Sequence, residues 1–180
     1  STFEQGRKYL APGLFGPCGY GLPAIIGAKI GCPDTPVVGF AGDGAFGIAV
    51  TELTAIGRAE WPPVTMVVFR NYQWGAEKRN STLWYEDNFV GTELDDGVSY
   101  AGIAQACGLK GVQTKTMDAL TEALNTAIKD QMENGVTTLI EAMTNQELGD
   151  LIEALTKAGV PDAGAHRRYT CDVERRQTAK

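Results

Sequence analysis

The chain has 180 residues, of which 43% are hydrophobic and 21% are charged, and these values indicate one soluble globular domain. Its net charge of −6 argues against nucleic acid or an anionic membrane surface as a partner. No stretch approaches about 18 consecutive apolar residues and no signal-peptide pattern is visible, so we expect a cytoplasmic protein with no membrane partner.

The cysteine and histidine content gives no sign of a zinc site. The four cysteines form no CxxC pair, and the single histidine, His166, lies in the polar tail. Free thiols in a reducing compartment are the expectation from this pattern. The cysteines are Cys18, Cys32, Cys107 and Cys171.

In the first half of the chain, short β-branched runs alternate with longer stretches of helical period. The stretch "LPAIIGAKIG" predicts a helix that ends near Gly31. A strand is expected at residues 37–41, then a helix over "AFGIAVTELTAIGRAE" that stops before Pro62, then a strand at residues 64–71. Both strands are nearly continuous in apolar residues, which is typical of strands covered on both faces.

The second half begins with a long weakly apolar segment, residues 74–98, which is rich in charged and aromatic side chains. Loops of this length are usually functional. A strand is expected at roughly residues 111–114, then an amphipathic helix over "MDALTEALNTAIKDQMENG", then a strand at residues 138–143. The fold class predicted is α/β, a doubly wound, mostly parallel sheet with helices on both faces.

A carboxylate and an amide follow the first two predicted strands. Asp43 leaves the first strand between Gly42 and Gly44, which let the backbone approach a ligand closely. A helix starting near Ala45 would point its N–H groups at an anion, and Asn71 ends the adjoining strand. Because ligands collect beyond the carboxyl ends of parallel strands, the pair predicts a clamp for Mg²⁺ and a diphosphate. The alternative is a tight turn and a strand-end cap without a ligand.

Twenty-six residues separate the "GDG" turn from Asn71, with a strand at each end and a helix between. This pattern resembles the thiamine diphosphate motif of transketolase, pyruvate decarboxylase and acetohydroxyacid synthase. The resemblance implies thiamine diphosphate and Mg²⁺ as cofactors. It implies a metal site made by the side chains of Asp43 and Asn71 with the main-chain carbonyl of Gln73, and diphosphate contacts from the amides of Gly44, Ala45 and Gly75.

Upstream, "FGPCGYGLPAIIGAKIG" resembles the segment that supports the bent coenzyme in relatives of acetohydroxyacid synthase. The resemblance implies that Cys18 wedges between the two coenzyme rings and that the Gly16 carbonyl accepts a hydrogen bond from the exocyclic amine. The alternative is that Cys18 is a buried apolar cysteine behind a glycine-rich turn.

Residues 71–111 and 132–150 indicate which family of thiamine diphosphate enzymes the chain resembles. The stretches "NYQWGAEKRNSTLWYEDNFVGTELDDGVSYAGIAQACGLKG" and "MENGVTTLIEAMTNQELGD" closely resemble the sulfoacetaldehyde acetyltransferases, thiamine diphosphate enzymes of bacterial sulfonate metabolism. The resemblance implies that sulfoacetaldehyde and phosphate become acetyl phosphate and sulfite. Both substrates are anions, which Lys78 and Arg79 could bind through charge-assisted hydrogen bonds. The alternative for these two cations is a solvated loop cluster paired to Glu77.

The family's chains are longer and carry, on an earlier domain, the glutamate that activates the aminopyrimidine ring. The resemblance therefore implies a partner, a pyrimidine-binding domain or subunit with that glutamate, in a homo- or hetero-oligomer. Residues 1–150 are expected to form the domain for thiamine diphosphate and Mg²⁺, and residues 151–180 a C-terminal tail of unknown role.

Two further functions stay open at this point. Because the metal clamp is common to the whole group, a 2-oxoacid decarboxylase or an acetolactate synthase-type enzyme with the same coenzyme would carry it too. Only residues 74–94 favour the sulfonate substrate. A coenzyme-binding subunit without catalysis is the alternative from another class of protein.

Overall fold

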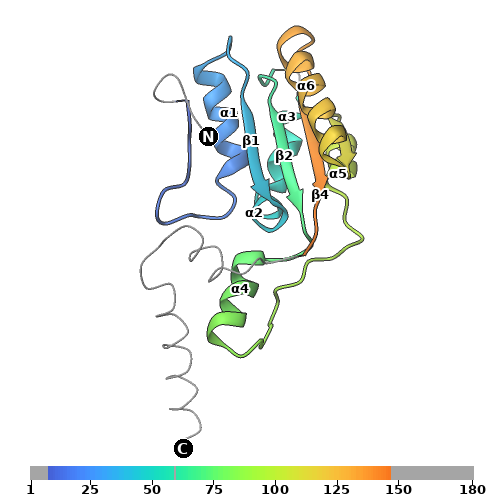
Figure 1. The fold of residues 1–180 in the computed structure, drawn as a ribbon. Coiled ribbons are helices and arrows are strands. Elements are labelled where there is room, and N and C mark those ends of the chain that lie inside the picture. The colour runs from blue at the N-terminus through green and yellow to red at the C-terminus, as the bar shows by residue number, and fades with distance from the viewer. Residues whose placement is uncertain (1–7, 59, 147–180) are drawn as a thin grey trace, which may run out of the picture. The chain divides into compact units, whose positions relative to one another are not determined.

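The computed structural model describes residues 8–58 and 60–146 and contains an all-parallel sheet with strand order β1-β2-β4-β3 (Figure 1). The strands are β1 (Val38–Gly42), β2 (Thr65–Arg70), β3 (Lys110–Thr114) and β4 (Thr138–Met143). The helices are α1 (Gly21–Gly31), α2 (Asp43–Ile48), α3 (Leu53–Ile56), α4 (Gly75–Trp84), α5 (Tyr100–Ala106) and α6 (Met117–Glu133), with the 3-10 turn η1 (Val50–Glu52).

The described chain divides into two compact units. The first unit runs to Gln73 and resumes at Leu94, and it contains the whole sheet with every helix except α4. The second unit is built on Trp74–Glu93 and contains α4.

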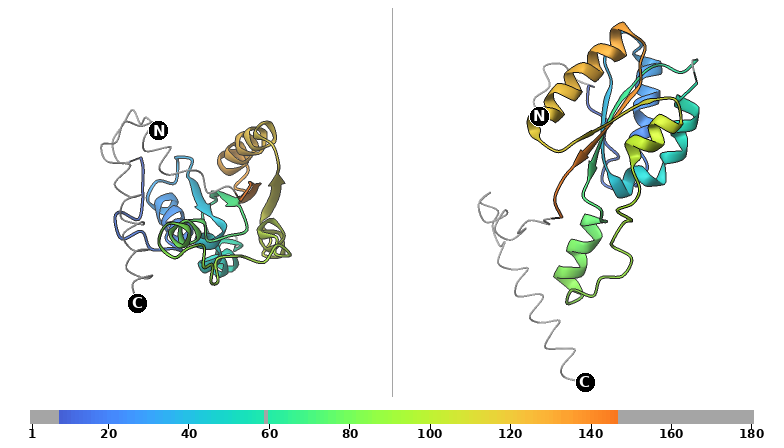
Figure 2. Two further views of the ribbon diagram at one scale, coloured as in Figure 1. Left: turned by 60° about the horizontal axis from the view of Figure 1, so that its bottom comes forward. Right: turned by 90° about the vertical axis from the view of Figure 1, so that its right-hand side faces the viewer.

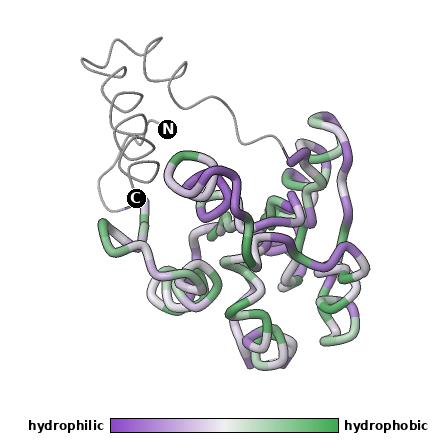
Figure 3. The backbone as a smooth tube through the Cα atoms, turned by 90° about the horizontal axis from the view of Figure 1, so that it is seen from below, coloured by the Kyte–Doolittle hydropathy of each residue, from purple (hydrophilic) through white to green (hydrophobic). Residues whose placement is uncertain are grey.

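Helices cover both faces of the sheet in the first unit (Figure 2). On one face, α1, α2, α3 and α5 pack against alternate strand residues that include Met66 and Val68. On the opposite face, α6 packs Ala127 against Val67 and Ile140. Successive strand side chains point to opposite faces, so a run such as "MVV" must be apolar throughout. Figure 3 shows hydrophobic stretches of the described backbone separated by hydrophilic ones.

The predicted fold class is confirmed, because the sheet is parallel and has helices on both faces. The four predicted strands are found, each shifted by at most one residue at either end. The helix formed by "LPAIIGAKIG" is α1, which ends at Gly31 as expected, and the long helix after residue 116 is α6. Its end is followed by Gly135 at φ +66, a conformation that favours glycine.

Two helix predictions are corrected by the structure. The single helix predicted over residues 45–60 is broken into α2, η1 and α3, and α2 begins at Asp43 instead of near Ala45. The break falls at Ile48, Val50 and Thr51, whose β-branched side chains lower helix propensity.

The segment predicted as one long loop, residues 74–98, contains the helix α4. Its residues "GAEKRNSTLW" form no strong apolar stripe, so hydrophobic periodicity could not reveal it. The helix α5 was also missed, although Ser99 caps it by accepting a hydrogen bond from the amide of Gly102 at 3.0 Å.

The predicted tail, residues 151–180, lies outside the described residues, and so do His166 and Cys171. Within residues 8–58 and 60–146, no helix is long and apolar enough to cross a membrane.

Candidate functional site

The parallel register brings Asp43 beside Asn71. Gly42 at the end of β1 pairs with Phe69 of β2, so the residues that follow the two strands leave the sheet together. Asp43 is the first residue of α2 and is only 1% exposed, although a carboxylate is rarely buried without partners. The buried Asp43 carboxylate therefore needs partners that stabilise its charge.

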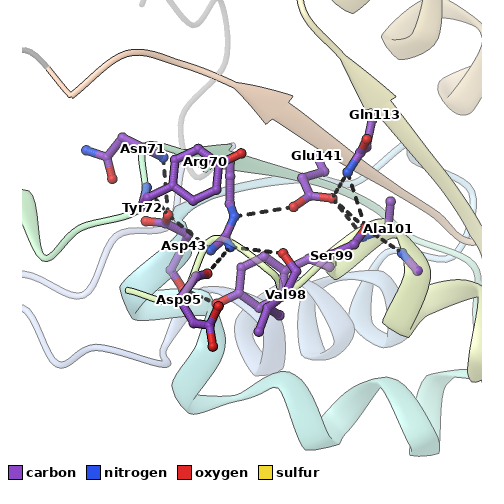
Figure 4. Close-up of polar contacts among 12 residues, drawn as sticks. Asp43, Arg70, Asn71, Tyr72, Asp95, Val98, Ser99, Ala101, Gln113 and Glu141 are labelled. Carbon is purple, nitrogen blue, oxygen red and sulfur yellow. Dashed lines mark hydrogen bonds and ion pairs between the residues drawn. The ribbon is translucent and has the colours of Figure 1, made fainter. Parts of the chain in front are cut away.

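The two oxygens of the Asp43 carboxylate have different partners (Figure 4). Oδ2 accepts hydrogen bonds from the amides of Tyr72 at 2.7 Å and Asn71 at 3.1 Å, and lies 3.4 Å from Arg70 Nη1. Oδ1 accepts one hydrogen bond, from the amide of Gly44 at 3.0 Å. Oδ2 is therefore the structural oxygen, and Oδ1 is the one with coordination left for a ligand.

Asp43 Oδ1 and the Gln73 main-chain oxygen both lie close to the Asn71 side-chain amide. One terminal atom of the Asn71 side-chain amide lies 3.0 Å from the Gln73 main-chain oxygen and 3.1 Å from Asp43 Oδ1. An NH₂ group at that atom would donate to both acceptors, whereas an oxygen there would need a cation between the three groups. Octahedral Mg²⁺ with oxygens at about 2.1 Å has neighbouring ligands about 3.0 Å apart, so these separations fit a shared Mg²⁺.

Tyr72 sits between two of these groups with a left-handed backbone, φ +61, which costs a non-glycine residue about 1–3 kcal/mol. This turn lets the Asn71 side chain and the Gln73 carbonyl face the same point. The conformation is held by the Tyr72 amide on Asp43 and by the Tyr72 carbonyl, which accepts from the amide of Leu94 at 2.8 Å. Strain of this kind is common at binding sites.

The structure also reveals an arginine that the sequence reasoning missed. Arg70 is 1% exposed, and its guanidinium lies between Asp43 and Glu141 (Figure 4). Its Nε is 3.5 Å from Glu141 Oε1, and its Nη2 donates to the carbonyls of Asp95 at 2.6 Å and Val98 at 2.9 Å. The guanidinium is thus the charge partner of the buried Asp43.

Glu141, also 1% exposed, is the second buried carboxylate of this network. Its Oε2 accepts hydrogen bonds from Ser99 Oγ at 3.1 Å, the Ala101 amide at 3.1 Å and Gln113 Nε2 at 2.9 Å. The charged residues inside the apolar runs "TMVVFRN" and "TLIEAM" were the signal that could have revealed this network.

Tyr100 completes the support under Asp43. Its hydroxyl donates to the Asp43 main-chain oxygen at 3.1 Å, and its ring meets Phe46 edge-on with the centroids 5.2 Å apart. Burial raises the pKa of the Tyr100 hydroxyl, so the group stays protonated and remains a donor.

The predicted diphosphate residues divide between the two units. At the end of β1, a Cβ added to Gly42 would meet nothing within 4 Å, so the strand end faces open space. The Gly44 amide already donates to Asp43, and a diphosphate would have to share it. Ala45 follows in the first turn of α2, while Gly75 begins α4 in the second unit. Their coenzyme contacts stay predictions.

Gly16 and Cys18 precede α1 in an exposed segment. Gly16 has φ +57, a conformation that favours glycine, and Cys18 is an exposed free thiol. The alternative that Cys18 is a buried apolar cysteine is therefore wrong. The predicted wedge and carbonyl roles of the two residues stay predictions.

Lys78 and Arg79 lie on α4 in the second unit, both half-buried. The ammonium of Lys78 forms an ion pair with Glu93 and lies 5.2 Å from the centroid of the Phe89 ring. The alternative of a loop cluster paired to Glu77 is wrong in its partner for Lys78, which pairs with Glu93. An anionic substrate at Lys78 would compete with the Glu93 carboxylate.

The chain is similar to thiamine diphosphate enzymes in sequence and structure. The C-terminal TPP binding domain of thiamine pyrophosphate enzymes matches residues 1–142. "Sulfoacetaldehyde acetyltransferase" from Roseovarius nubinhibens is 82% identical over 149 residues, which cover 83% of this chain and 24% of the relative. The protein of the same name from Rhodobacter capsulatus is 80% identical over 149 residues, 83% of this chain and 25% of its own.

Among solved structures, the thiamine diphosphate-dependent 4-hydroxybenzoylformate decarboxylase of Rhodococcus jostii RHA1 is similar, with a TM-score of 0.60 and 29% identity. The similarity covers 73% of this chain and 24% of the decarboxylase. The chain thus spans about a quarter of the length of the curated relatives it matches.

Proposed function

Since this chain belongs to the thiamine pyrophosphate enzymes, whose C-terminal TPP binding domain matches residues 1–142, we propose that it holds the diphosphate of thiamine diphosphate through Mg²⁺. The observation that carries the proposal is the convergence of Asp43 Oδ1, the Asn71 amide and the Gln73 carbonyl at separations of 3.0 and 3.1 Å. One charged and two neutral oxygen ligands leave Mg²⁺ positions for diphosphate oxygens and water.

The charges of the buried network support this assignment. Asp43, Arg70 and Glu141 are each 1% exposed and together carry a net charge of −1. A divalent cation at Asp43 offsets that charge and attracts the diphosphate, whose oxygens would otherwise be repelled by the carboxylate. The open space beyond Gly42 gives the diphosphate a way to approach the end of β1.

For the whole reaction we propose that sulfoacetaldehyde and phosphate are converted into acetyl phosphate and sulfite. The support is the 82% identity to a protein named sulfoacetaldehyde acetyltransferase. Thiamine diphosphate, when bound, supplies the nucleophilic carbon for this chemistry. The aldehyde carbon becomes the acyl carbon, while the carbon–sulfur bond breaks and its electron pair leaves with sulfite.

This chain supplies the metal and diphosphate part of such a site. We propose that a pyrimidine-binding domain or subunit supplies the activating glutamate, in a homo- or hetero-oligomer in the cytoplasm. The quarter of each relative's length that the chain matches supports a larger assembly. The residues 1–150 would be the domain for thiamine diphosphate and Mg²⁺ within it.

The anion sites are proposed at Lys78 and Arg79. Lys78 is half-buried and paired with Glu93, so it binds an anion only by exchanging one negative partner for another. A substrate that carries a full negative charge at this position can make that exchange without leaving the ammonium unpaired. The Glu93 carboxylate is therefore expected to tune the apparent affinity for sulfoacetaldehyde or phosphate.

The assay that tests the function uses the assembled enzyme with sulfoacetaldehyde, Mg²⁺ and thiamine diphosphate. Sulfite should appear together with acetyl phosphate, and its release should depend on phosphate apart from slow leakage to acetate. Pyruvate should be a poor substrate, because a pocket shaped for one anion stabilises the transition state of another reaction weakly. Efficient pyruvate decarboxylation without sulfite release would instead identify a 2-oxoacid decarboxylase or an acetolactate synthase-type enzyme.

Two matched variants test the anion site. Lys78→Ala should raise the apparent KM for sulfoacetaldehyde or phosphate, whereas Glu93→Gln should leave it equal or lower because it removes the competing carboxylate. If both variants keep the parent KM values, Lys78 is a solvated surface charge. A protein that binds the coenzyme but shows no turnover with any aldehyde or 2-oxoacid, even when assembled, would be a non-catalytic subunit.

A further inference from the structure

We propose that Arg70 is a positioning residue that directs one oxygen of Asp43 to the metal, an inference that rests on the Mg²⁺ site proposed above. A carboxylate can rotate, bind a metal with two oxygens, or share both oxygens with hydrogen-bond donors. In this chain Arg70 Nη1 lies 3.4 Å from Oδ2 and no contact between Arg70 and Oδ1 is formed within the hydrogen bonds described. The guanidinium thus distinguishes the two oxygens.

Backbone donors reinforce the same distinction. Oδ2 accepts hydrogen bonds from the amides of Asn71 and Tyr72 in addition to its contact with Arg70, whereas Oδ1 accepts one from the amide of Gly44. With three donors on one oxygen, the carboxylate plane is fixed. Oδ1 then faces the Asn71 amide at 3.1 Å, which is the direction of the proposed cation.

Arg70 is itself fixed from the other side. Its Nε faces Glu141 at 3.5 Å, and its Nη2 donates to the carbonyls of Asp95 and Val98 at 2.6 and 2.9 Å. The ring of Tyr72 covers the guanidinium, with the ring centroid 4.4 Å from Arg70 Cζ. Both terminal nitrogens of the guanidinium donate to protein acceptors and Nε lies in an ion pair with Glu141, so Arg70 is suited to hold Asp43 and not to bind substrate.

The charge of Arg70 also repels a cation, and this effect opposes the positioning effect in a measurement of Mg²⁺ affinity alone. The two effects separate when two cations of equal charge are compared, because the repulsion acts on both alike. Mg²⁺ demands near-ideal octahedral geometry, whereas Ca²⁺ accepts irregular coordination at longer distances. A positioning role therefore predicts a change in the ratio of the Mg²⁺ and Ca²⁺ affinities.

The experiment measures both affinities by calorimetry on the assembled enzyme, freed of metal with EDTA and titrated with each cation in the same fixed excess of thiamine diphosphate. Arg70→Met removes both the positive charge and the guanidinium donors. Arg70→Lys keeps the charge, but its ammonium cannot donate to the same set of acceptors. Both variants should lower the Mg²⁺ affinity relative to the Ca²⁺ affinity by about tenfold, since residues that orient metal ligands typically change metal affinity by about 10–100-fold. An unchanged ratio in both variants would overturn the proposal.

Controls separate this inference from folding and from the proposed function. Lys110→Met removes another ion pair, the one with Asp130 at 2.7 Å, and should leave the ratio unchanged. If Arg70→Met does not fold, the double variant Arg70→Met with Glu141→Gln removes the opposite charges together and should show the same lowered ratio.

If Asp43→Ala binds Mg²⁺ as the parent does, the proposed metal site itself is wrong. If Asp43→Ala loses Mg²⁺ while the Arg70 variants keep the ratio, only the role of Arg70 is wrong.

Discussion

Asp43 and Asn71 are both proposed as metal ligands, but the structure predicts that their removal affects the metal-free protein very differently. Asp43→Ala should destabilise the protein even without Mg²⁺, because the Asp43 carboxylate is part of the internal hydrogen-bond network. Asn71→Ala should weaken metal binding while lowering the metal-free stability much less than Asp43→Ala does.

The magnitudes follow from the contacts. Asp43 accepts main-chain hydrogen bonds from Tyr72 at 2.7 Å and Asn71 at 3.1 Å, and each bond to a charged group contributes about 1.5–3 kcal/mol. Losing both gives a cost of about 3–6 kcal/mol, in the range of about 3–5 kcal/mol for breaking a buried ion pair. With its amide turned so that the NH₂ group faces these acceptors, the half-buried Asn71 side chain donates to the Gln73 carbonyl at 3.0 Å and to Asp43 Oδ1 at 3.1 Å, so its removal should cost about 1–2 kcal/mol, less than that of Asp43.

Native-state hydrogen exchange on the metal-free assembled enzyme measures this difference where it arises. The amides of Asn71 and Tyr72 should lose most of their protection in Asp43→Ala, and Asp43→Asn should give an intermediate loss because it keeps an acceptor oxygen but not the charge. Calorimetry with Mg²⁺ and thiamine diphosphate should show loss of binding in Asp43→Ala and weaker binding in Asn71→Ala. Equal metal-free stability of Asp43→Ala and the parent would refute the view that the carboxylate holds the strand ends together.

Two further predictions test the backbone around the site. At Tyr72, with φ +61, substitution by Val should destabilise by about 1–3 kcal/mol more than substitution by Gly, as measured by thermal unfolding, because a β-branched residue tolerates that conformation poorly. At Gly111, an added Cβ would lie 2.0 Å from the Ala101 carbonyl oxygen, so Gly111→Ala should lower the unfolding temperature; Gly27→Ala, in open space on α1, should raise stability by about 0.5–1 kcal/mol. Similar unfolding temperatures for both alanine variants would contradict the close approach of α5 to β3.

The strands and the juxtaposition of Asp43 and Asn71 could be predicted from the sequence because both depend on short-range pattern. A strand buried on both faces must be apolar along its length, and the runs at residues 64–71 and 138–143 show this directly. A parallel neighbour then places the residues after β1 and β2 at one edge, so Asp43 and Asn71 meet without any further information.

Other features depend on contacts that spacing does not encode. The partner of Arg70 is Glu141, which is distant in the sequence and reaches it only through the pairing of β2 with β4. The left-handed backbone of Tyr72 has no sequence signal, since tyrosine rarely adopts it. The helix α4 lacks an apolar stripe, so hydrophobic periodicity gives no sign of it.

The network explains how Asp43, a proposed metal ligand, can be buried as a carboxylate. A lone carboxylate at 1% exposure would protonate or destabilise the fold. Arg70 and the two main-chain amides stabilise its charge through Oδ2, so that Oδ1 remains a charged ligand before the cation arrives. The network includes a second buried carboxylate, Glu141, which faces Arg70 Nε through Oε1 and whose Oε2 accepts hydrogen bonds from Ser99, Ala101 and Gln113. The position of the Asp43 carboxylate at the strand ends therefore depends on residues as far away as the start of α5 and the strand β3.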